Sequence, residues 1–163
     1  MPAILASHRE DDGLRVFTDT SELESALGQE LGSTDWIEID QERVDKFAEA
    51  TDDHQWIHVD RERAEAGPFG GTIAHGYLTL SLIPWLSSQI FAFETPGARL
   101  NYGLNKVRFP APVRVGKRIR ATATLQEVKD LPAGKQVVVV YTILIEDEPK
   151  PACVAETVVL LLH

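Results

Sequence analysis

The sequence has little cysteine and shows no segment typical of secretion. Cys153 is the single cysteine in 163 residues, which excludes an internal disulfide and favours a reducing compartment. Residues Met1–Asp12 are short and mixed, without the basic-then-apolar pattern of a secretory signal. Repeats and low-complexity segments are also lacking. We therefore expect a cytoplasmic protein with a loose tail at residues 1–14 and a single domain at residues 15–163.

Acidic residues are missing from one stretch of an otherwise acidic chain. The net charge of −9 argues against general nucleic-acid binding. Residues Thr95–Gln126, however, contain seven lysine and arginine residues and no acidic one. This basic strip is either a solvated strand face or a place for an anionic ligand such as a phosphate-bearing cofactor.

Charge of either sign is missing from Gly76–Phe93. Apolar residues cover nearly every side of a helical wheel there, which predicts a long, buried central helix. A membrane span would also fit the length. Several serine and threonine residues and Pro84 within the segment argue against a span, so we expect no membrane crossing.

The remaining pattern predicts helices first and strands afterwards. A capping box at Ser21–Glu24 and leucines at helical spacing predict a helix that ends near Gly32. Asp40 is expected to cap a second helix that ends by Thr51, and Asp60 a short third one. Trp36–Ile39 is expected to be a short strand. Four further strands are predicted at residues 104–109, 118–128, 136–146 and 152–162, joined by short Pro/Gly-containing connections. Short connections require mostly antiparallel pairing, so the fold class is α+β, with a sheet of about five strands around the helix.

Asp53 and His58 place a carboxylate and an imidazole close together in sequence. On one helix, side chains five residues apart would point about 140° apart. The two groups therefore converge only where the backbone between them turns. A carboxylate–imidazole pair followed by a glycine at a helix start suits proton transfer to or from water beside a polarised carbonyl.

Three blocks of the sequence resemble the MaoC-like dehydratases, the hydratase-2 type of (R)-specific enoyl-CoA hydratase. Thr51–Asp60 reads TDDHQWIHVD and resembles the signature Ser/Thr-Gly-Asp-x-Asn-Pro-aliphatic-His, in the form of a subgroup with Gln-Trp-Ile-His. Thr72–Leu82 (TIAHGYLTLSL) resembles the start of the family's central helix, and Asn101–Val113 (NYGLNKVRFPAPV) its next strand. The blocks occur in the family's order, and the similarity extends from about Val16 to the C-terminus.

The resemblance implies a hot-dog fold, a homodimer, and reversible addition of water to trans-2-enoyl-CoA that gives (R)-3-hydroxyacyl-CoA. Asp53 and His58 carry over as the catalytic pair that activates the water, and the Gly76 N–H as the donor to the thioester carbonyl. Cofactors are not expected, because coenzyme A is part of the substrate. The thioester carrier is either coenzyme A or acyl-carrier protein.

Further residues are expected to bind the substrate or support the site. Gln55 is an amide able to orient water or substrate, although Gln55-Trp56 stands where the signature has Asn-Pro. Asp52 replaces the signature's glycine, which either raises a neighbouring carboxyl pKa or demands a different turn. His75 is expected to brace the loop beside the substrate. Ser81 either lines the acyl pocket or bonds back to a helix carbonyl. Arg108, Arg114, Lys117 and Arg118 are the candidates for contacting the coenzyme A phosphates.

Each assignment has an alternative. Asp53 alone would be a loop carboxylate and His58 a core histidine with its hydrogen bonds satisfied. A metal site from His54 and His58 is not expected, because a metalloprotease helix needs glutamate directly after its first histidine, where Gln55 stands. At the level of the whole protein, the alternatives are a non-catalytic acyl-thioester-binding module and an acyl-CoA thioesterase.

Overall fold

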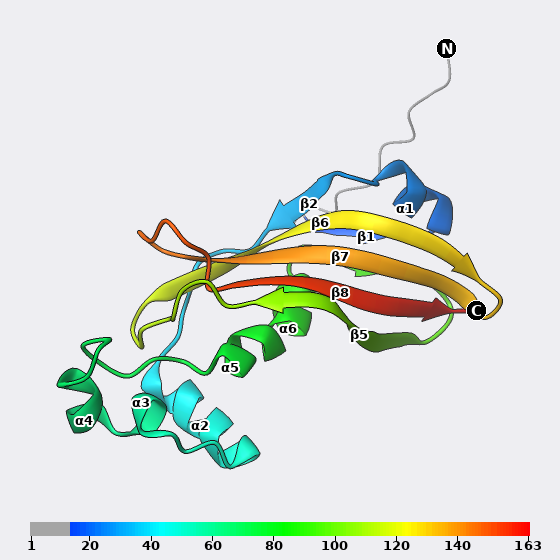
Figure 1. Ribbon diagram of the computed structural model, residues 1–163. Coiled ribbons are helices and arrows are strands. Elements are labelled where there is room, and N and C mark those ends of the chain that lie inside the picture. Colours follow the sequence, from blue (N-terminus) through cyan, green and yellow to red (C-terminus); the bar gives the residue numbers. More distant parts are fainter. Residues whose placement is uncertain (1–13) are drawn as a thin grey trace.

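The computed structural model describes residues 14–163, so the predicted tail falls outside the described residues except for Leu14. Its main feature is one antiparallel sheet in the order β2-β6-β7-β8-β5, with β3 pairing with β6 as well (Figure 1). The strands are β2 (Glu30–Ser33), β3 (Ile37–Glu38), β5 (Arg99–Arg108), β6 (Arg118–Leu131), β7 (Gly134–Ile145) and β8 (Cys153–Leu162). The antiparallel prediction is confirmed, with six strands in place of about five and with β5 starting five residues early.

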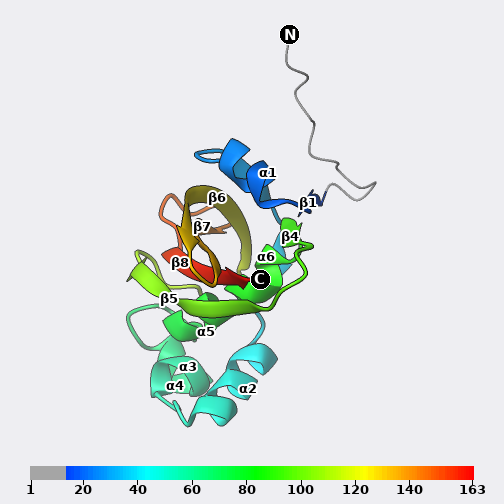
Figure 2. The same cartoon turned by 90° about the vertical axis from the view of Figure 1, so that its right-hand side faces the viewer.

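Residues 14–163 also form six helices. They are α1 (Thr20–Ser25), α2 (Gln41–Thr51), α3 (Trp56–Val59), α4 (Arg61–Glu65), α5 (Gly76–Ser81) and α6 (Ile83–Ser87). The sheet curves around α5 and α6, whereas α2, α3 and α4 gather beyond one end of it (Figure 2). The predicted caps of α2 and α4 are confirmed, because the Asp40 carboxylate accepts from Arg43 N and the Asp60 carboxylate from Arg63 N.

The core lies between the concave face of the sheet and α5–α6. Leu78, Ile83 and Leu86 from the helices pack with β-sheet residues such as Val139 and Ile143 in one buried cluster. Each large aliphatic side chain of this kind contributes about 1.5–3 kcal/mol when fully buried. This packing fixes where α5 begins, and with it the position of the residues around Gly76.

The predicted long helix over residues 76–93 is wrong in its extent. It is divided at Leu82 into α5 and α6, and residues Phe91–Phe93 instead form strand β4, which pairs in parallel with β1 (Arg15–Phe17). Pro84 has no N–H for a continuous helix and occupies the first turn of α6, where none is needed. Nor is the segment buried on all sides, since Tyr77 is 70% exposed and Trp85 45%. None of the helices that residues 14–163 form has the length and hydrophobicity of a membrane crossing.

The predicted helix over residues 21–32 is also too long. Asp19, not Ser21, is the cap, accepting from Ser21 N at 2.8 Å. The helix ends at Ser25, and Gly28 then takes a left-handed conformation with φ 76°. Leu31, which matched the helical spacing, is buried within β2. Pairing of β2 with β6, and not the helical spacing of the leucines, therefore decides the structure of this segment.

Candidate active site

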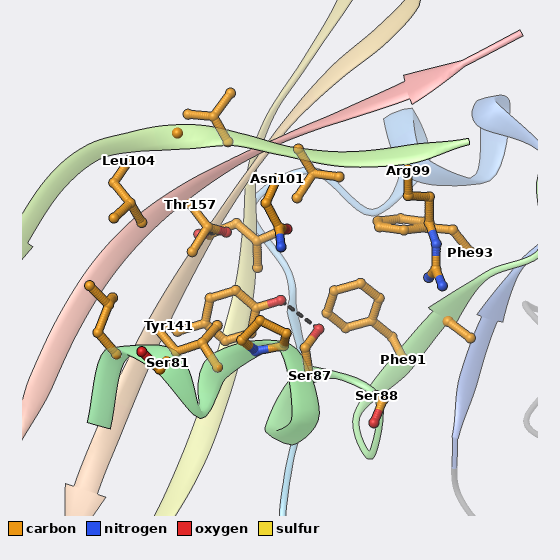
Figure 3. A pocket seen from close by; sticks show the side chains of 18 residues that line it. Ser81, Ser87, Ser88, Phe91, Phe93, Arg99, Asn101, Leu104, Tyr141 and Thr157 are labelled. Atoms are coloured by element: carbon orange, nitrogen blue, oxygen red, sulfur yellow. Dashed lines mark hydrogen bonds between the residues drawn. The ribbon is translucent and has the colours of Figure 1, made fainter. Parts of the chain in front are cut away.

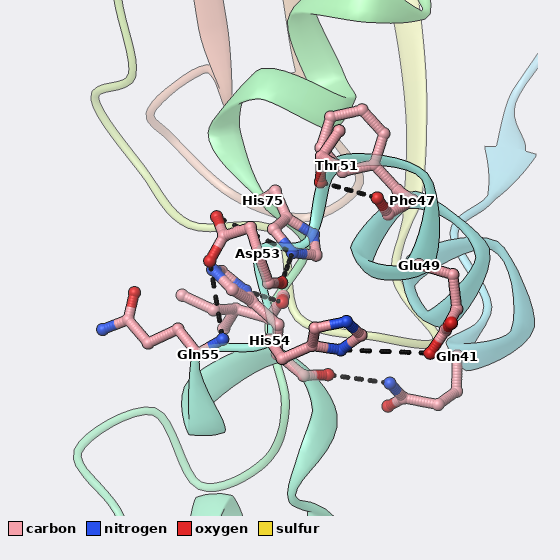
Figure 4. Close-up of polar contacts among 10 residues, drawn as sticks. Gln41, Phe47, Glu49, Thr51, Asp53, His54, Gln55 and His75 are labelled. Carbon is pink, nitrogen blue, oxygen red and sulfur yellow. Dashed lines mark hydrogen bonds and ion pairs between the residues drawn. The ribbon is translucent and has the colours of Figure 1, made fainter.

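Asp53, His58 and His75 meet at the junction of α2, α3 and α5, and Figure 4 shows Asp53 beside His75. One side-chain ligand atom from each residue lies within 4.8 Å of those of the other two. Asp53 and His58 converge because α2 ends at Thr51 and α3 begins at Trp56, so the backbone turns between them. The predicted proximity of Asp53 and His58 is confirmed.

The turn depends on Asp52, which has φ 57° and ψ 21° at the end of α2. This left-handed conformation is the one that glycine adopts most readily at a helix C-terminus. A glycine at this position, as in the family signature, would adopt the same conformation readily. The expectation of a turn different from that of the family stays a prediction.

His58 is buried, and its ring is fixed by a hydrogen bond. Its Nδ1 lies 2.6 Å from the carbonyl oxygen of Ile73, so Nδ1 carries the hydrogen and donates it. In the neutral ring this leaves Nε2 with a free lone pair. Burial is the largest influence on the pKa of His58 and lowers it; the hydrogen bond to the Ile73 carbonyl opposes this in part, His75 lowers the pKa by less, and Asp53 has the smallest, raising effect. His58 is therefore arranged as a proton acceptor at neutral pH.

His75 immediately precedes α5 and is almost completely buried. Its Nε2 donates to the backbone carbonyl of Asp53 at 2.9 Å, and its ring stacks on that of His58 with the centroids 3.8 Å apart. The ring of Phe47, from α2, also packs against the His75 ring, with 5.0 Å between the centroids. The expected brace on the Asp53 loop is confirmed, whereas substrate binding by His75 stays a prediction.

The Asp53 side chain is about half exposed, unlike the two histidines. Its Oδ1 accepts weakly from Gln55 N at 3.4 Å, and its Oδ2 lies 4.0 Å from His75 Nε2. The carboxylate is thus oriented by its loop while its outer lone pairs remain accessible. A carboxylate of this kind, next to a neutral imidazole, is able to hold and exchange the proton of a shared water.

Gly76 is the first residue of α5 and directly follows His75. The N–H of a residue at this position has no partner within its own helix. A Cβ at Gly76 would lie 3.2 Å from ring atoms of Phe109, so any larger residue would press against that ring. Glycine therefore leaves room beside an N–H that is free to donate.

Gln41 and Thr72 were missed by the sequence analysis. The Gln41 Nε2 donates to the His58 carbonyl at 2.8 Å, and the Thr72 hydroxyl donates to Gln41 Oε1 at 2.5 Å. This buried amide ties α2, α3 and the segment before α5 together behind His58. The buried face of α2 includes residues 41, 44 and 48. Extending the predicted stripe from Val44 by one turn towards the N-terminus would have identified Gln41 as a buried polar residue.

Gln55 has no side-chain hydrogen bond among residues 14–163, and Figure 4 shows its amide extending away from His75. Its predicted contact with water or substrate stays a prediction. Trp56, in contrast, has a structural role. It packs about 3.1 Å from the position of a Cβ on Gly67, and Arg63 stacks 4.3 Å from the ring centroid. The tryptophan fixes the helix pair α3–α4 beneath the site.

The four basic residues predicted to bind phosphate make their hydrogen bonds and ion pairs, within residues 14–163, with partners other than His58 and His75. Arg114 donates to the carbonyl of Gly70 at 2.8 Å and holds that loop. Lys117 pairs with Glu148 at 3.5 Å, and Arg118 forms a two-point pair with Glu146. Arg108 is exposed and donates to the carbonyl of its neighbour Val107. Arg108 is thus the most available of the four, and its predicted role stays untested.

A cavity of about 540 Å³ lies between α5–α6 and the strands β5, β7 and β8 (Figure 3). Leu80 and Ser81, one turn after Gly76, form part of its lining. The prediction that Ser81 lines a pocket is confirmed, and its contact with an acyl chain remains to be tested. The cavity also contains a hydrogen bond between Ser87 and Tyr141 at 2.7 Å.

The geometry of the histidine pair does not suit a metal ion. Each ring donates one nitrogen hydrogen to a backbone carbonyl, which leaves one nitrogen lone pair on each ring. The rings are inclined by 25° and stacked, so their in-plane lone pairs run nearly side by side instead of meeting at one point. His54 lies apart from this cluster and faces Glu49 at 4.0 Å.

Comparison with known proteins identifies a family and relatives that this chain resembles in sequence. A family described as "MaoC like domain" matches residues 22–147. The "3-hydroxyacyl-thioester dehydratase Z" of Mycobacterium tuberculosis strain H37Rv is 54% identical over 147 residues, covering 90% of this chain and 97% of that protein. "Nodulation protein N" of Rhizobium meliloti is 45% identical over 139 residues, covering 83% and 86%.

Solved structures share the hot-dog fold at lower sequence identity. The (R)-hydratase from A. caviae involved in PHA biosynthesis has a TM-score of 0.68 and 23% identity, over 83% of this chain and 96% of that one. The R-hydratase PhaJ1 from Pseudomonas aeruginosa also gives a TM-score of 0.68 and 23% identity, over 84% and 82%. The predicted hot-dog fold is confirmed.

Proposed function

This chain belongs to the MaoC-like dehydratase family, and we propose that it hydrates trans-2-enoyl-CoA reversibly to (R)-3-hydroxyacyl-CoA. The observation that carries the proposal is the meeting of Asp53 and His58 beside Gly76. The relatives indicate dehydratase chemistry, and a residue of the site can be assigned to each step of that reaction.

The first step needs a water held between the acid and the base. Two hydrogen bonds of about 2.8 Å from one water span a gap of the size found between the Asp53 and His58 side chains. His58 Nε2 accepts a proton as the water oxygen attacks C3, and Asp53 accepts the second hydrogen of that water as a hydrogen bond. The protonated His58 then gives this proton to C2 of the enolate on the same face, which restores the thioester carbonyl and the neutral imidazole, so one water is added across the double bond.

The second requirement is stabilisation of negative charge on the thioester oxygen. As water attacks C3, electron density moves through C2 to this oxygen and forms an enolate. The Gly76 N–H, at the first position of α5, would donate to it. Glycine fits this position because a Cβ would press against the Phe109 ring. Removal of one such donor from an enzyme typically lowers kcat by about 10²–10³.

The acyl chain would lie in the cavity that starts one turn further along α5. Leu80, Ile83 and Pro84 form its helical wall, and β5, β7 and β8 form the opposite wall. A chain bound with its carbonyl at Gly76 would pass Ser81 and follow α6. This direction suits a medium or long acyl chain.

A homodimer joined through β5 is part of the same proposal. Within residues 14–163, β5 pairs with β8 along one edge and ends the sheet at the other. Leu100, Tyr102 and Leu104 on this terminal strand are 48%, 69% and 47% exposed. A long apolar edge strand is prone to pair with another chain, and pairing with a second β5 would cover it. Tyr102→Asp should therefore give a smaller species by light scattering, whereas Leu27→Asp, at an apolar residue exposed on the far side of the sheet, should not.

Turnover of crotonyl-CoA tests the function. The absorbance of the conjugated enoyl thioester should fall on addition of the wild-type protein, and chiral separation should yield the (R) product. Asp53→Asn and His58→Gln should each abolish the decrease with the thermal unfolding transition retained. His54→Gln and Asp52→Asn are matched controls, since these neighbours lie outside the cluster, and both should remain active.

Other outcomes identify the alternatives. Release of free thiol from saturated acyl-CoA would indicate a thioesterase, because hydration releases none. Saturable binding of enoyl-CoA esters without turnover at any chain length would indicate a binding module. Full activity in Asp53→Asn or His58→Gln would refute the assignment of the catalytic pair.

A further inference from the structure

The cavity along α5–α6 is less apolar than an unsubstituted hydrocarbon chain requires. Hydroxyl groups of Ser81, Ser87, Ser88, Tyr141 and Thr157 contribute to its lining. Some of them are satisfied locally, because Ser88 donates to the Trp85 carbonyl and Thr157 to the Val139 carbonyl. The Ser87–Tyr141 pair is different.

Ser87 and Tyr141 carry one hydroxyl hydrogen each and share one hydrogen bond of 2.7 Å. Whichever hydroxyl donates in this bond, the hydrogen of the other one is left over. Neither hydroxyl has another hydrogen-bond partner among residues 14–163. The pair therefore presents one surplus O–H donor to the cavity.

The surroundings make this donor costly to leave unused. Tyr141 is 4% exposed, and burial raises its pKa to about 12, so the phenol keeps its hydrogen at all physiological pH values. Phe91, Ile83 and Val139 line the same space. Ser87 is partly exposed, so the donor is left unpaired only when a hydrocarbon chain covers it. A ligand that supplies an acceptor therefore gains a hydrogen bond relative to one that does not.

A second polar group reaches the same space from the opposite wall. Figure 3 shows Asn101 extending from β5 towards Tyr141, across the cavity from α6. Its amide has no hydrogen bond within residues 14–163. Polar groups thus approach the middle of the cavity from two sides, with apolar residues between them.

We infer that Ser87 and Tyr141 form a subsite for an oxygen atom on the acyl chain, so that the preferred thioester carries a keto or hydroxyl group far from its carbonyl. The inference rests on the proposed function for the direction of the chain. Ser87 lies eleven residues after Gly76, which corresponds to roughly 16 Å along a helix. An extended chain advances about 1.2 Å per bond, so a twelve-carbon chain spans about 13 Å. A hydrogen bond of about 2.8 Å at each end covers the remaining distance, which places the oxygen in the outer half of a chain of this length.

Binding of saturated ligands tests the subsite without turnover. Calorimetry would compare dodecanoyl-CoA with a series of its keto derivatives, which are isomers of one another and carry a single keto group at successive carbons of the outer half. One isomer should bind about tenfold more tightly than dodecanoyl-CoA, as expected for one additional hydrogen bond. Equal affinity across the series would overturn the inference, whatever the result of the crotonyl-CoA assay.

Variants of Ser87 and Tyr141 change the number of hydroxyl groups that can bind an oxygen atom in the cavity. Ser87→Ala and Tyr141→Phe each leave one hydroxyl, so each should retain part of the preference for the keto ligand. The double variant has no hydroxyl and should lose the preference while binding dodecanoyl-CoA at least as well as the wild type. A preference that survives in the double variant would overturn the assignment to this pair.

Turnover then separates this inference from the proposed function. If both fail, no enoyl thioester is hydrated and the keto ligands bind no better than dodecanoyl-CoA. If the subsite alone fails, crotonyl-CoA is hydrated but the matched keto and plain enoyl thioesters have equal kcat/KM. Thermal unfolding of each variant, with and without dodecanoyl-CoA, distinguishes a lost subsite from a lost fold, because ligand bound to the native state raises Tm.

Discussion

His58 and His75 stack with ring centroids 3.8 Å apart and ring planes inclined by 25°. Each ring is held by a separate backbone carbonyl, that of Ile73 for His58 and that of Asp53 for His75. The pair therefore connects the segment before α5 with the Asp53 loop. This arrangement sets the geometry on which proton transfer depends.

Replacement of His75 tests the brace. His75→Phe keeps an aromatic ring against His58 but removes the donor to the Asp53 carbonyl. We expect kcat to fall by about 10²-fold with little change in KM, since a small misplacement of a catalytic group has an effect of this size. Steady-state kinetics measure both constants. His75→Gln, which retains an N–H donor, should lose less activity, and equal loss in the two variants would contradict the brace.

The pH dependence of activity follows from the environment of His58. Burial is the largest cause of its lowered pKa, so the neutral base persists below the ordinary histidine value of 6.5. The acid limb of the kcat/KM profile should therefore lie below pH 6.5. A limb above this value would indicate another group.

The same shift predicts how stability depends on pH. The unfolded chain binds a proton at His58 at a higher pH than the folded chain does, so unfolding becomes easier as the pH falls below about 6.5. The loss should cease once the pH is below the folded-state pKa. Urea unfolding at a series of pH values measures it, and His58→Gln should show a smaller slope than the wild type between pH 7 and the acid limit.

Gln41 is expected to contribute to both stability and activity. Gln41→Ala removes donors and acceptors for the His58 carbonyl and the Thr72 hydroxyl. Loss of a buried partner of this kind costs about 1–3 kcal/mol, and kcat should fall as His58 loses its support. Lys46→Ala on the same helix removes only an exposed pair with Glu42 and should leave the stability nearly unchanged. Similar unfolding curves for both variants would contradict the buried network.

Asp52 tests the left-handed turn at the end of α2. A residue with φ 57° suits glycine and tolerates aspartate, whereas alanine is strained there by about 1 kcal/mol or more. Asp52→Gly should therefore be more stable than Asp52→Ala, and both should keep catalytic activity. Thermal unfolding of the two variants gives the comparison. A reversed order would mean that the carboxylate, and not the backbone, is the important feature of this position.

Local signals in the sequence predicted the elements that depend on local chemistry. The caps Asp40 and Asp60 and the turn between Asp53 and His58 follow from short-range hydrogen bonding and chain direction. The strands β6, β7 and β8 were recognisable from their β-branched residues. The proximity of Asp53 and His58 was predictable because α2 ends just before Asp53, so the two residues do not lie on one continuous helix.

What the sequence did not predict depends on distant partners. Leu31 matched a helical stripe, but pairing of β2 with β6 placed it in a strand. Residues Phe91–Phe93 belong to an uncharged segment that looked helical, but they form strand β4 because they pair with β1, which is far away in the sequence. Gln41 and Thr72 are thirty-one residues apart, and their bond is visible only once the fold brings them together. Long-range packing decides in each of these cases.

Hydration in deuterium oxide tests the central claim most directly, the delivery of one water from between Asp53 and His58. Nuclear magnetic resonance of the product from crotonyl-CoA should show one deuterium at C2 on the same face as the new C3 hydroxyl. The wild type and His54→Gln should form this product, and Asp53→Asn and His58→Gln should not. A product with deuterium on both faces of C2, or the same product from Asp53→Asn, would contradict the account.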